Sequence, residues 1–253
     1  ALPIYLRWEK KKEVNIGIDF GFLDDRISGN IDYYNRKTED LLWDYTVPSP
    51  PYLYSSMVAN AGSMRNSGIE VGITAIPIQT KDFQWTTSTN YSTNKNKLLS
   101  LSNDQFISSG YSDKGSTGDP LQTTTHRIQE GEPIGNFWGY KTIDIDDNGH
   151  WIIEGADGNP KPISEQQPTD KQVIGNGLPK HYLNWNNSIS WKGFDFSVTM
   201  RGAFGFDILN MPRLQYGAPV MLARGNVLNE AFDTKFGNSP LAIDQELQYV
   251  RDR

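Results

Sequence analysis

The stretch ISWKGFDFSVTM, residues 189–200, decides the fold class of this chain. Bulky apolar residues alternate with small or polar ones on both sides of the Lys192-Gly193 pair. Alternation with a period of two predicts strands, and a two-residue loop between them predicts a hairpin of fixed register, with Asn184 opposite Arg201. The residues expected on one apolar face are Ile189, Trp191, Phe194, Phe196, Val198 and Met200. Those expected on the opposite, polar face are Ser190, Asp195, Ser197 and Thr199.

The same alternation recurs along the chain and predicts an all-β fold. In the first hairpin the apolar faces coincide if Phe22 pairs with Ile27. The stretch that begins at Phe83 gives the weakest strand, because Thr87 and Thr89 occupy its apolar face. The main strands are expected near 13–36, 64–96 and 181–206. Shorter strands are expected in GNFWGYKTIDI, residues 135–145, and in ELQYVRDR, residues 246–253.

The composition narrows the function classes. The 253 residues carry a formal charge of -6, so the basic stripe typical of nucleic-acid binding is not expected. The chain contains no cysteine, which excludes disulfides and thiolate metal sites. No run approaches the roughly 18 apolar residues of a membrane helix, but a membrane β-strand needs only about ten residues with one apolar face.

Short and long connections between the expected strands alternate. Short turns lie near Asp24, Gln79 and Lys192, and the long connections lie near 37–62, 98–180 and 207–245. If consecutive strands are antiparallel, all short turns fall at one end of the sheet and all long connections at the other. Outer-membrane barrels have this layout, with short periplasmic turns and long extracellular loops.

Two readings of the apolar face remain open on alternation alone. In a membrane barrel this face contacts lipid, whereas in a secreted soluble β-sandwich that binds glycans it packs on a second sheet. The alternation of connections favours the barrel, as do the aromatic pairs beside each short turn, where an interfacial girdle would lie. A third class, a β-rich glycoside hydrolase, needs two carboxylates about 5–9.5 Å apart, and no pattern places such a pair.

Four stretches resemble the C-terminal barrel portion of SusC/RagA-type TonB-dependent outer-membrane transporters of Bacteroidetes. They are LRWEKKKEVNIGIDFGF and its continuation to Leu42, residues 60–101, EGEPIGNFWGYK at 130–141, and residues 174–210. The resemblance implies a large antiparallel transmembrane β-barrel of about 22 strands with long extracellular loops. Residues 1–253 would then be a fragment of the barrel domain, without the plug domain.

The resemblance also implies a function and partners. It implies TonB-dependent import of oligosaccharides or peptides across the bacterial outer membrane, as the transporter subunit of a SusCD-type complex. The implied partners are a SusD-like surface lipoprotein that contacts the long loops, the TonB complex through the missing N-terminal part, the remainder of the barrel, and outer-membrane lipid. It implies neither catalysis nor a cofactor.

Candidate substrate contacts are polar residues on the inward face and aromatic residues in the long loops. The inward-facing candidates are Asp32, Glu70, Asp195 and Arg201. The loop aromatics, which could stack on sugar rings, are Trp43, Tyr45, Trp138, Tyr140 and Trp151. Solvated wall and simple loop packing are the competing interpretations of these residues.

Evidence for a metal site or for catalysis is weak. DIDDNG partly fits a calcium loop through Asp144, Asp146 and Asn148, but Gly155 stands where the bidentate acid is expected. A β-turn therefore explains this stretch better, and we expect the loop to bind calcium weakly or not at all. The three histidines have no ligand spacing, and the Asp24-Asp25 pair fits a solvated turn.

Overall fold

The computed structural model describes residues 6–46, 53–104, 107–118, 122–146, 150–217, 223 and 225–229. The expected all-β fold is confirmed, with an antiparallel seven-stranded sheet as its main feature. The strands of this sheet are β1 (Lys10–Phe22), β2 (Ile27–Glu39), β5 (Ser63–Gln79), β6 (Phe83–Thr93), β7 (Lys95–Ser100), β15 (His181–Trp191) and β16 (Phe194–Phe204). Their order is β1-β2-β5-β6-β15-β16, and β7 also pairs with β5. The sequence ELQYVRDR lies outside the described residues.

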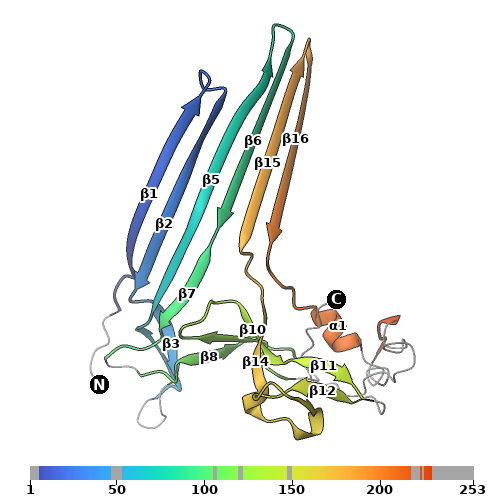
Figure 1. The fold of residues 1–253 in the computed structure, drawn as a ribbon. Coiled ribbons are helices and arrows are strands. Elements are labelled where there is room, and N and C mark those ends of the chain that lie inside the picture. Colours follow the sequence, from blue (N-terminus) through green and yellow to red (C-terminus); the bar gives the residue numbers. More distant parts are fainter. Residues whose placement is uncertain are drawn as a thin grey trace. The chain divides into compact units, whose positions relative to one another are not determined.

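Tight turns join the strands into three hairpins, which lie side by side with their turns at the same end of the sheet (Figure 1). The predicted register is confirmed in the first and last hairpins, where Phe22 pairs with Ile27 and Asn184 pairs with Arg201. Lys192 and its neighbouring glycine both have positive φ, the condition that a two-residue hairpin turn of this kind requires. The long connections all leave from the opposite end, which we call the long-connection end.

The two faces of the sheet differ in chemistry as the alternation predicted. The predicted apolar set around Trp191 and Phe196 shares one face, because directly paired residues of an antiparallel ladder lie on the same side. Trp191, Phe194 and Phe196 are 53%, 76% and 61% exposed, so no second sheet covers them among the described residues. This arrangement does not fit the β-sandwich alternative.

Two Trp-centred contacts explain the weakest predicted strand. On the apolar face Trp185 Nε1 donates to Thr87 Oγ1 at 2.9 Å, and Trp85 Nε1 donates to Asn187 Oδ1 at 3.2 Å. The hydroxyl oxygen of Thr87 and the amide oxygen of Asn187 therefore each accept from an indole on the neighbouring strand. The hydroxyl of Thr87 is compatible with an otherwise apolar surface for this reason.

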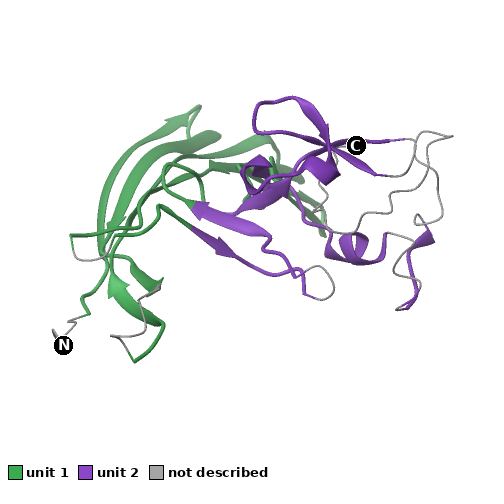
Figure 2. Ribbon diagram, turned by 90° about the horizontal axis from the view of Figure 1, so that it is seen from below, with its two compact units in different colours: residues 1–111, 129–134, 178–206 green, residues 112–128, 135–177, 207–253 purple. Residues whose placement is uncertain are grey.

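The chain divides into two compact units, coloured separately in Figure 2. Unit 1 comprises residues 1–111, 129–134 and 178–206, and unit 2 comprises residues 112–128, 135–177 and 207–253. Besides the main sheet, unit 1 contains the hairpin of β3 (Leu42–Thr46) and β4 (Ser56–Asn60). The buried residues Tyr45, Ala59 and Ala61 form a small core, on which Trp43 packs.

Unit 2 is built from two small sheets. The sheet β14-β10-β9-β8 consists of β8 (Tyr111–Lys114), β9 (His126–Gln129), β10 (Asn136–Tyr140) and β14 (Lys171–Asn176). The sheet β11-β12-β13 consists of β11 (Thr142–Ile145), β12 (Trp151–Glu154) and β13 (Pro160–Pro162). The helical turns are η1 (Ile163–Glu165), η2 (Pro168–Asp170) and α1 (Met211–Tyr216). None of the helices in the described part of the chain has the length and apolar character to span a membrane.

The prediction of one strand over GNFWGYKTIDI was wrong. The stretch forms two strands, β10 and β11, which separate at Lys141 and belong to different sheets. β10 pairs with β14, whereas β11 pairs with β12 in a hairpin closed around 146–150. Alternation marks both stretches as extended, but it carries no information about a change of pairing partner, which depends on tertiary contacts.

Asp170 is a buried acceptor that connects three segments of unit 2. Its side chain is 3% exposed and accepts hydrogen bonds from the backbone N–H groups of Ala156 at 2.9 Å and Gln167 at 2.6 Å. Lys161 Nζ lies 2.5 Å from its Oδ2. The hydrogen bond from Lys161, followed by those from the two backbone amides, holds the pKa of Asp170 below its ordinary value. This arrangement ties the turn after β12 to the segment before β14.

The substitution Asp170→Asn should loosen unit 2 locally. We expect hydrogen exchange of the Ala156 and Gln167 amides to accelerate about tenfold or more at pH 7, since the charge-assisted hydrogen bonds are lost. Because the folded pKa of Asp170 is lowered, its contribution to stability is present above the ordinary aspartate pKa of about 3.9 and disappears as the pH falls through the lower folded value. Wild-type protection, corrected for intrinsic exchange, should decline only in that acidic range.

The exposed Asp157 provides the matched control, since among the described residues its side-chain carboxylate accepts from Asn159, within its own turn. Asp157→Asn should leave the two amides protected. Equal acceleration in both variants would contradict the assigned role of Asp170.

Candidate functional site

The polar face of the main sheet carries a row of directly paired amide and charged side chains. From β1 to β16 the row consists of Asp19, Asn30, Gly72, Asn90, Asn184 and Arg201. We call this set the amide row. Each member pairs with the next across one strand spacing, about 4.8 Å, so the hydrogen-bonding side chains lie in a line across the sheet that only Gly72 interrupts. Such a line offers both donors and acceptors to a ligand that lies along the polar face.

A shallow depression of about 430 Å³ lies over the part of this row between β1 and β6, lined among others by Asn30, Gly72, Asn90 and Ser88. Gly72 is needed at its centre. A Cβ at this position would lie 2.5 Å from Asn30 Oδ1 and 3.2 Å from Asn90 Oδ1, so a larger residue would displace both amides. The glycine therefore lets the two amides lie over the backbone and face the depression.

Only two of the four predicted polar residues lie together. Asp32 and Glu70 are directly paired on β2 and β5, and Asp32 Oδ2 accepts a hydrogen bond from Asn30 Nδ2 at 2.6 Å. Arg201 belongs to the amide row, but it lies on β16, three strands away from Glu70. Asp195 lies apart from all of these, beside the hairpin turn and opposite Ser190. Their role in substrate binding stays a prediction.

The sequence predicted that Asn184 faces Arg201, but it did not name Asn30, Asn90 or Asn184 as candidate contacts. Asn184 Oδ1 is buried and has no hydrogen-bond partner among the described residues. Because the opposite residue is Arg201, this acceptor and a guanidinium lie at one end of the row. The pairing within the last hairpin was predictable, but the alignment of Asn90 with Asn184 joins two hairpins and was not.

The loop aromatics of unit 1 pack into its small core. Tyr45 is buried, and its hydroxyl donates to the carbonyl oxygen of Leu101. Burial, with a smaller contribution from the negative charge of Glu130, raises the pKa of Tyr45 to about 12. Trp43 packs against the same core. The faces of these rings are therefore in contact with the protein in this structure, although a binding role stays a prediction.

The loop aromatics of unit 2 also have protein partners. Trp151 is 2% exposed in a core with Ile145, Ile153 and Ile163, against which Tyr140 packs. Trp138 lies under the guanidinium of Arg127, with 4.0 Å between the guanidinium carbon and the ring centroid. Arg127 is in turn held by two hydrogen bonds to the Asp113 carboxylate, at 2.6 and 2.8 Å. This stack fixes the ring of Trp138.

The described part of the calcium-like stretch, Asp144 to Asp146, comprises the last residues of β11 and the residue that follows it. Asp146 Oδ1 accepts from the backbone N–H of His150 at 2.8 Å, and Asp144 Oδ1 accepts from the N–H of Ile145 at 2.9 Å. Asn148 lies outside the described residues. In the described part of the chain no three His, Cys, Asp or Glu side chains are grouped as metal ligands. Weak or absent calcium binding stays a prediction.

An antiparallel sheet of tight hairpins, with one apolar face, one polar face and all long connections at one end, defines the wall of an outer-membrane-type β-barrel. The TonB dependent receptor-like β-barrel family model matches residues 3–231. The chain therefore belongs to the TonB-dependent receptor β-barrel family.

Similar proteins agree with this assignment. TonB-dependent receptor P3 of Formosa agariphila is 33% identical over 243 residues, which cover 88% of this chain and 23% of that protein. TonB-dependent receptor SusC of Bacteroides thetaiotaomicron is 35% identical over 205 residues, which cover 78% of this chain and 20% of that protein. The chain thus spans about a fifth to a quarter of these relatives.

The fold is similar to that of a solved transporter. A structure of the RagAB peptide importer in its closed-closed state superposes with a TM-score of 0.71 at 24% identity, over 85% of this chain and 24% of that one. A second RagAB peptide transporter structure superposes with a TM-score of 0.69 at 22% identity. These likenesses support the barrel fold.

Proposed function

We propose that this chain forms part of the barrel wall of an outer-membrane, TonB-dependent transporter that imports oligosaccharides or peptides. The observation that carries the proposal is the two-faced sheet of a chain that belongs to the TonB-dependent receptor β-barrel family. The nine residues from Val14 to Phe22 place alternate apolar side chains on one face, and those from Leu183 to Trp191 do the same except at Asn187. This length suits a tilted membrane strand of about 9–11 residues.

The polar face suits cargo that forms many hydrogen bonds. Amides and a guanidinium in the amide row can bind sugar hydroxyls or peptide groups without recognising one sequence or linkage. The RagAB peptide importer, whose fold is similar, is a precedent for peptide cargo. In this proposal the described residues provide a wall for passage and perform no chemical step.

We further propose that the long connections contact a SusD-like surface lipoprotein. These connections expose large apolar side chains: Leu53 is 86% exposed, Tyr54 74% and Ile107 90%. Exposed apolar side chains of this size are typical of protein interfaces, where aromatic residues are enriched. By contrast, Leu98 and Leu101 at the start of the second long connection are 3% and 1% exposed, so they are buried inside this structure and do not offer a contact surface.

The substitution Ile107→Glu should reduce the amount of lipoprotein that co-purifies with the complete transporter from membranes. A carboxylate in a desolvated contact is costly, so we expect at least a tenfold weaker association, equivalent to about 1.4 kcal/mol. The measurement is the ratio of lipoprotein to transporter after mild detergent extraction. A point substitution is preferable to shortening the second long connection, for example by deleting residues 98–125, because that deletion would also remove the buried Leu98 and Leu101.

Ser109→Glu is the matched control, because Ser109 is also exposed and lies two residues away in the same connection. It adds the same charge without removing an apolar contact, so co-purification should persist. Unchanged co-purification in Ile107→Glu would place the interface elsewhere. Absence of any lipoprotein from the wild-type preparation would count against the proposed complex.

A further inference from the structure

A row of basic side chains crosses four strand segments of the main sheet near its long-connection end. Direct pairing joins Lys12 to Lys37, Lys37 to Arg65, and Arg65 to Lys97. We call these four residues the basic row. Lys12 and Val14 are two residues apart on β1, so their side chains point to the same face of the sheet. The basic row therefore lies on the apolar face. It stands two residues beyond Val14, roughly 7 Å along the strand.

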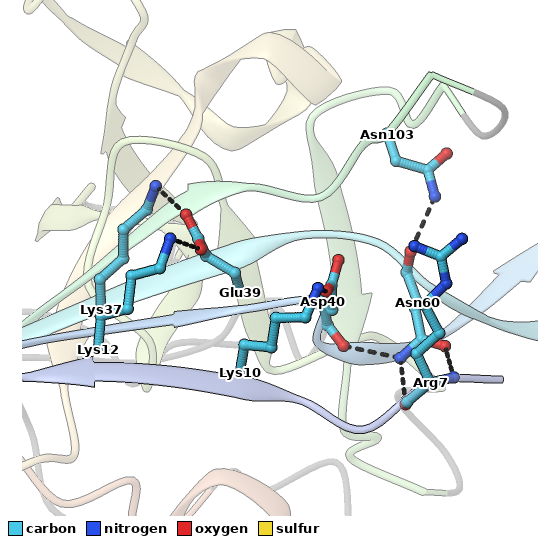
Figure 3. Close-up of polar contacts among 8 residues, drawn as sticks. All are labelled: Arg7, Lys10, Lys12, Lys37, Glu39, Asp40, Asn60 and Asn103. Atoms are coloured by element: carbon cyan, nitrogen blue, oxygen red, sulfur yellow. Dashed lines mark hydrogen bonds and ion pairs between the residues drawn. The ribbon is translucent and has the colours of Figure 1, made fainter.

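Within the described residues the basic row is only partly neutralised. Glu39 binds both Lys12 and Lys37, at 2.7 and 2.6 Å, and Lys10 pairs with Asp40 at 3.0 Å (Figure 3). Arg65 and Lys97 are exposed and have no ion pair there. Like charges directly opposite one another destabilise a sheet, so the Arg65–Lys97 pair carries a cost that an external anion would remove.

The other face of the same strands shows a different arrangement. Glu13 lies 3.0 Å from Arg36 and 3.1 Å from Lys11, so each of these two cations of the polar face has a carboxylate partner in the same hairpin. In these strand segments the cations Arg65 and Lys97, which lack an ion pair among the described residues, both lie on the apolar face. Lys95 is a further exposed cation on this face; it pairs with Ser67 and lies between the basic row and the apolar residues.

We infer that the basic row binds the phosphate of an anionic lipid headgroup, in the membrane leaflet at the long-connection end. The inference rests on the proposed function, because it needs the apolar face to contact lipid. If the hydrocarbon ends near Val14, headgroup phosphates lie at the depth of the basic row. Lysine stems then cover apolar surface while their ammonium groups reach the phosphates, and Arg65 can bind two phosphate oxygens at once.

The position and shape of the basic row favour a lipid over a soluble anion or a protein. The row is continuous with the apolar face and runs across the strands for about 15 Å, the width of three strand spacings. A lipid meets both features with one molecule, since its acyl chains contact the apolar residues below its phosphate. A free phosphate or an acidic protein segment uses only the charges.

The test compares lipid retention by two double variants of the complete transporter. In Arg65→Gln/Lys97→Gln the free part of the basic row is removed. The control Lys11→Gln/Lys81→Gln removes the same charge from the polar face and from the short turn at the opposite end. Each protein is reconstituted in phosphatidylcholine discs containing phosphatidylglycerol, extracted, and analysed by native mass spectrometry for bound lipid.

We expect the first variant to lose the preference for phosphatidylglycerol roughly 30-fold, which corresponds to about 1 kcal/mol for each of two cations. The control should keep the wild-type preference. Equal retention by both variants, or equal loss in both, would overturn the inference. It would also be overturned if inorganic phosphate competed fully with the lipid, or if the first variant lost its lipoprotein but kept its lipid.

If the proposed membrane function itself is wrong, the same experiment gives a different result. If the wild-type transporter does not insert into the discs, both proposals fall. If all variants insert and resist extraction by urea while lipid preference is unchanged, only the lipid site is wrong.

Discussion

The substitution Val198→Arg should destabilise the folded transporter by about 2–4 kcal/mol. Val198 lies on the apolar face of β16, opposite Asn187, and within the span of apolar residues that runs from Trp191 to Leu183 on the neighbouring strand. In the proposed membrane orientation this position is close to the bilayer midplane, where a guanidinium loses its hydration. Equilibrium unfolding of the complete protein by urea in lipid vesicles measures the change.

Thr199→Arg is the matched control, since it places the same side chain on the next residue and therefore on the polar face. We expect its free energy of unfolding to remain within about 0.5 kcal/mol of wild type, as for an ordinary surface substitution. If the two variants were destabilised equally, the apolar face would not be in contact with lipid.

The substitution Trp85→Phe should cost about 1–3 kcal/mol. It removes the indole N–H that donates to Asn187 Oδ1 at 3.2 Å, and leaves an amide oxygen without that donor on the apolar face. The double variant Trp85→Phe/Asn187→Leu should recover most of the loss, because removing both polar partners leaves nothing unsatisfied. The same unfolding measurement reports both changes.

Trp191→Phe serves as the control for loss of an indole, because Trp191 is 53% exposed and donates no side-chain hydrogen bond among the described residues. We expect a smaller effect than that of Trp85→Phe. Failure of Asn187→Leu to rescue the Trp85 variant would show that the indole contributes by packing alone.

Hairpin structure and the identity of each face were determined by the sequence itself. A two-residue turn at Lys192 leaves one register for the last hairpin, and a period of two then assigns every side chain to a face. The same reasoning paired Phe22 with Ile27 correctly. These features are local, because each depends on a turn and the residues that flank it.

The alignment of one hairpin with the next was decided only by the tertiary structure. Asn30 pairs with Gly72, and Asn90 pairs with Asn184, on strands that are separated in the sequence by long connections. A long connection does not determine the register of the strands that it joins. The amide row and the basic row both depend on these alignments. Burial of Tyr45 and Trp151 likewise needs partners from distant segments. Alternation in the sequence determines which face of the sheet a side chain occupies. Packing between distant segments determines which residues become its neighbours.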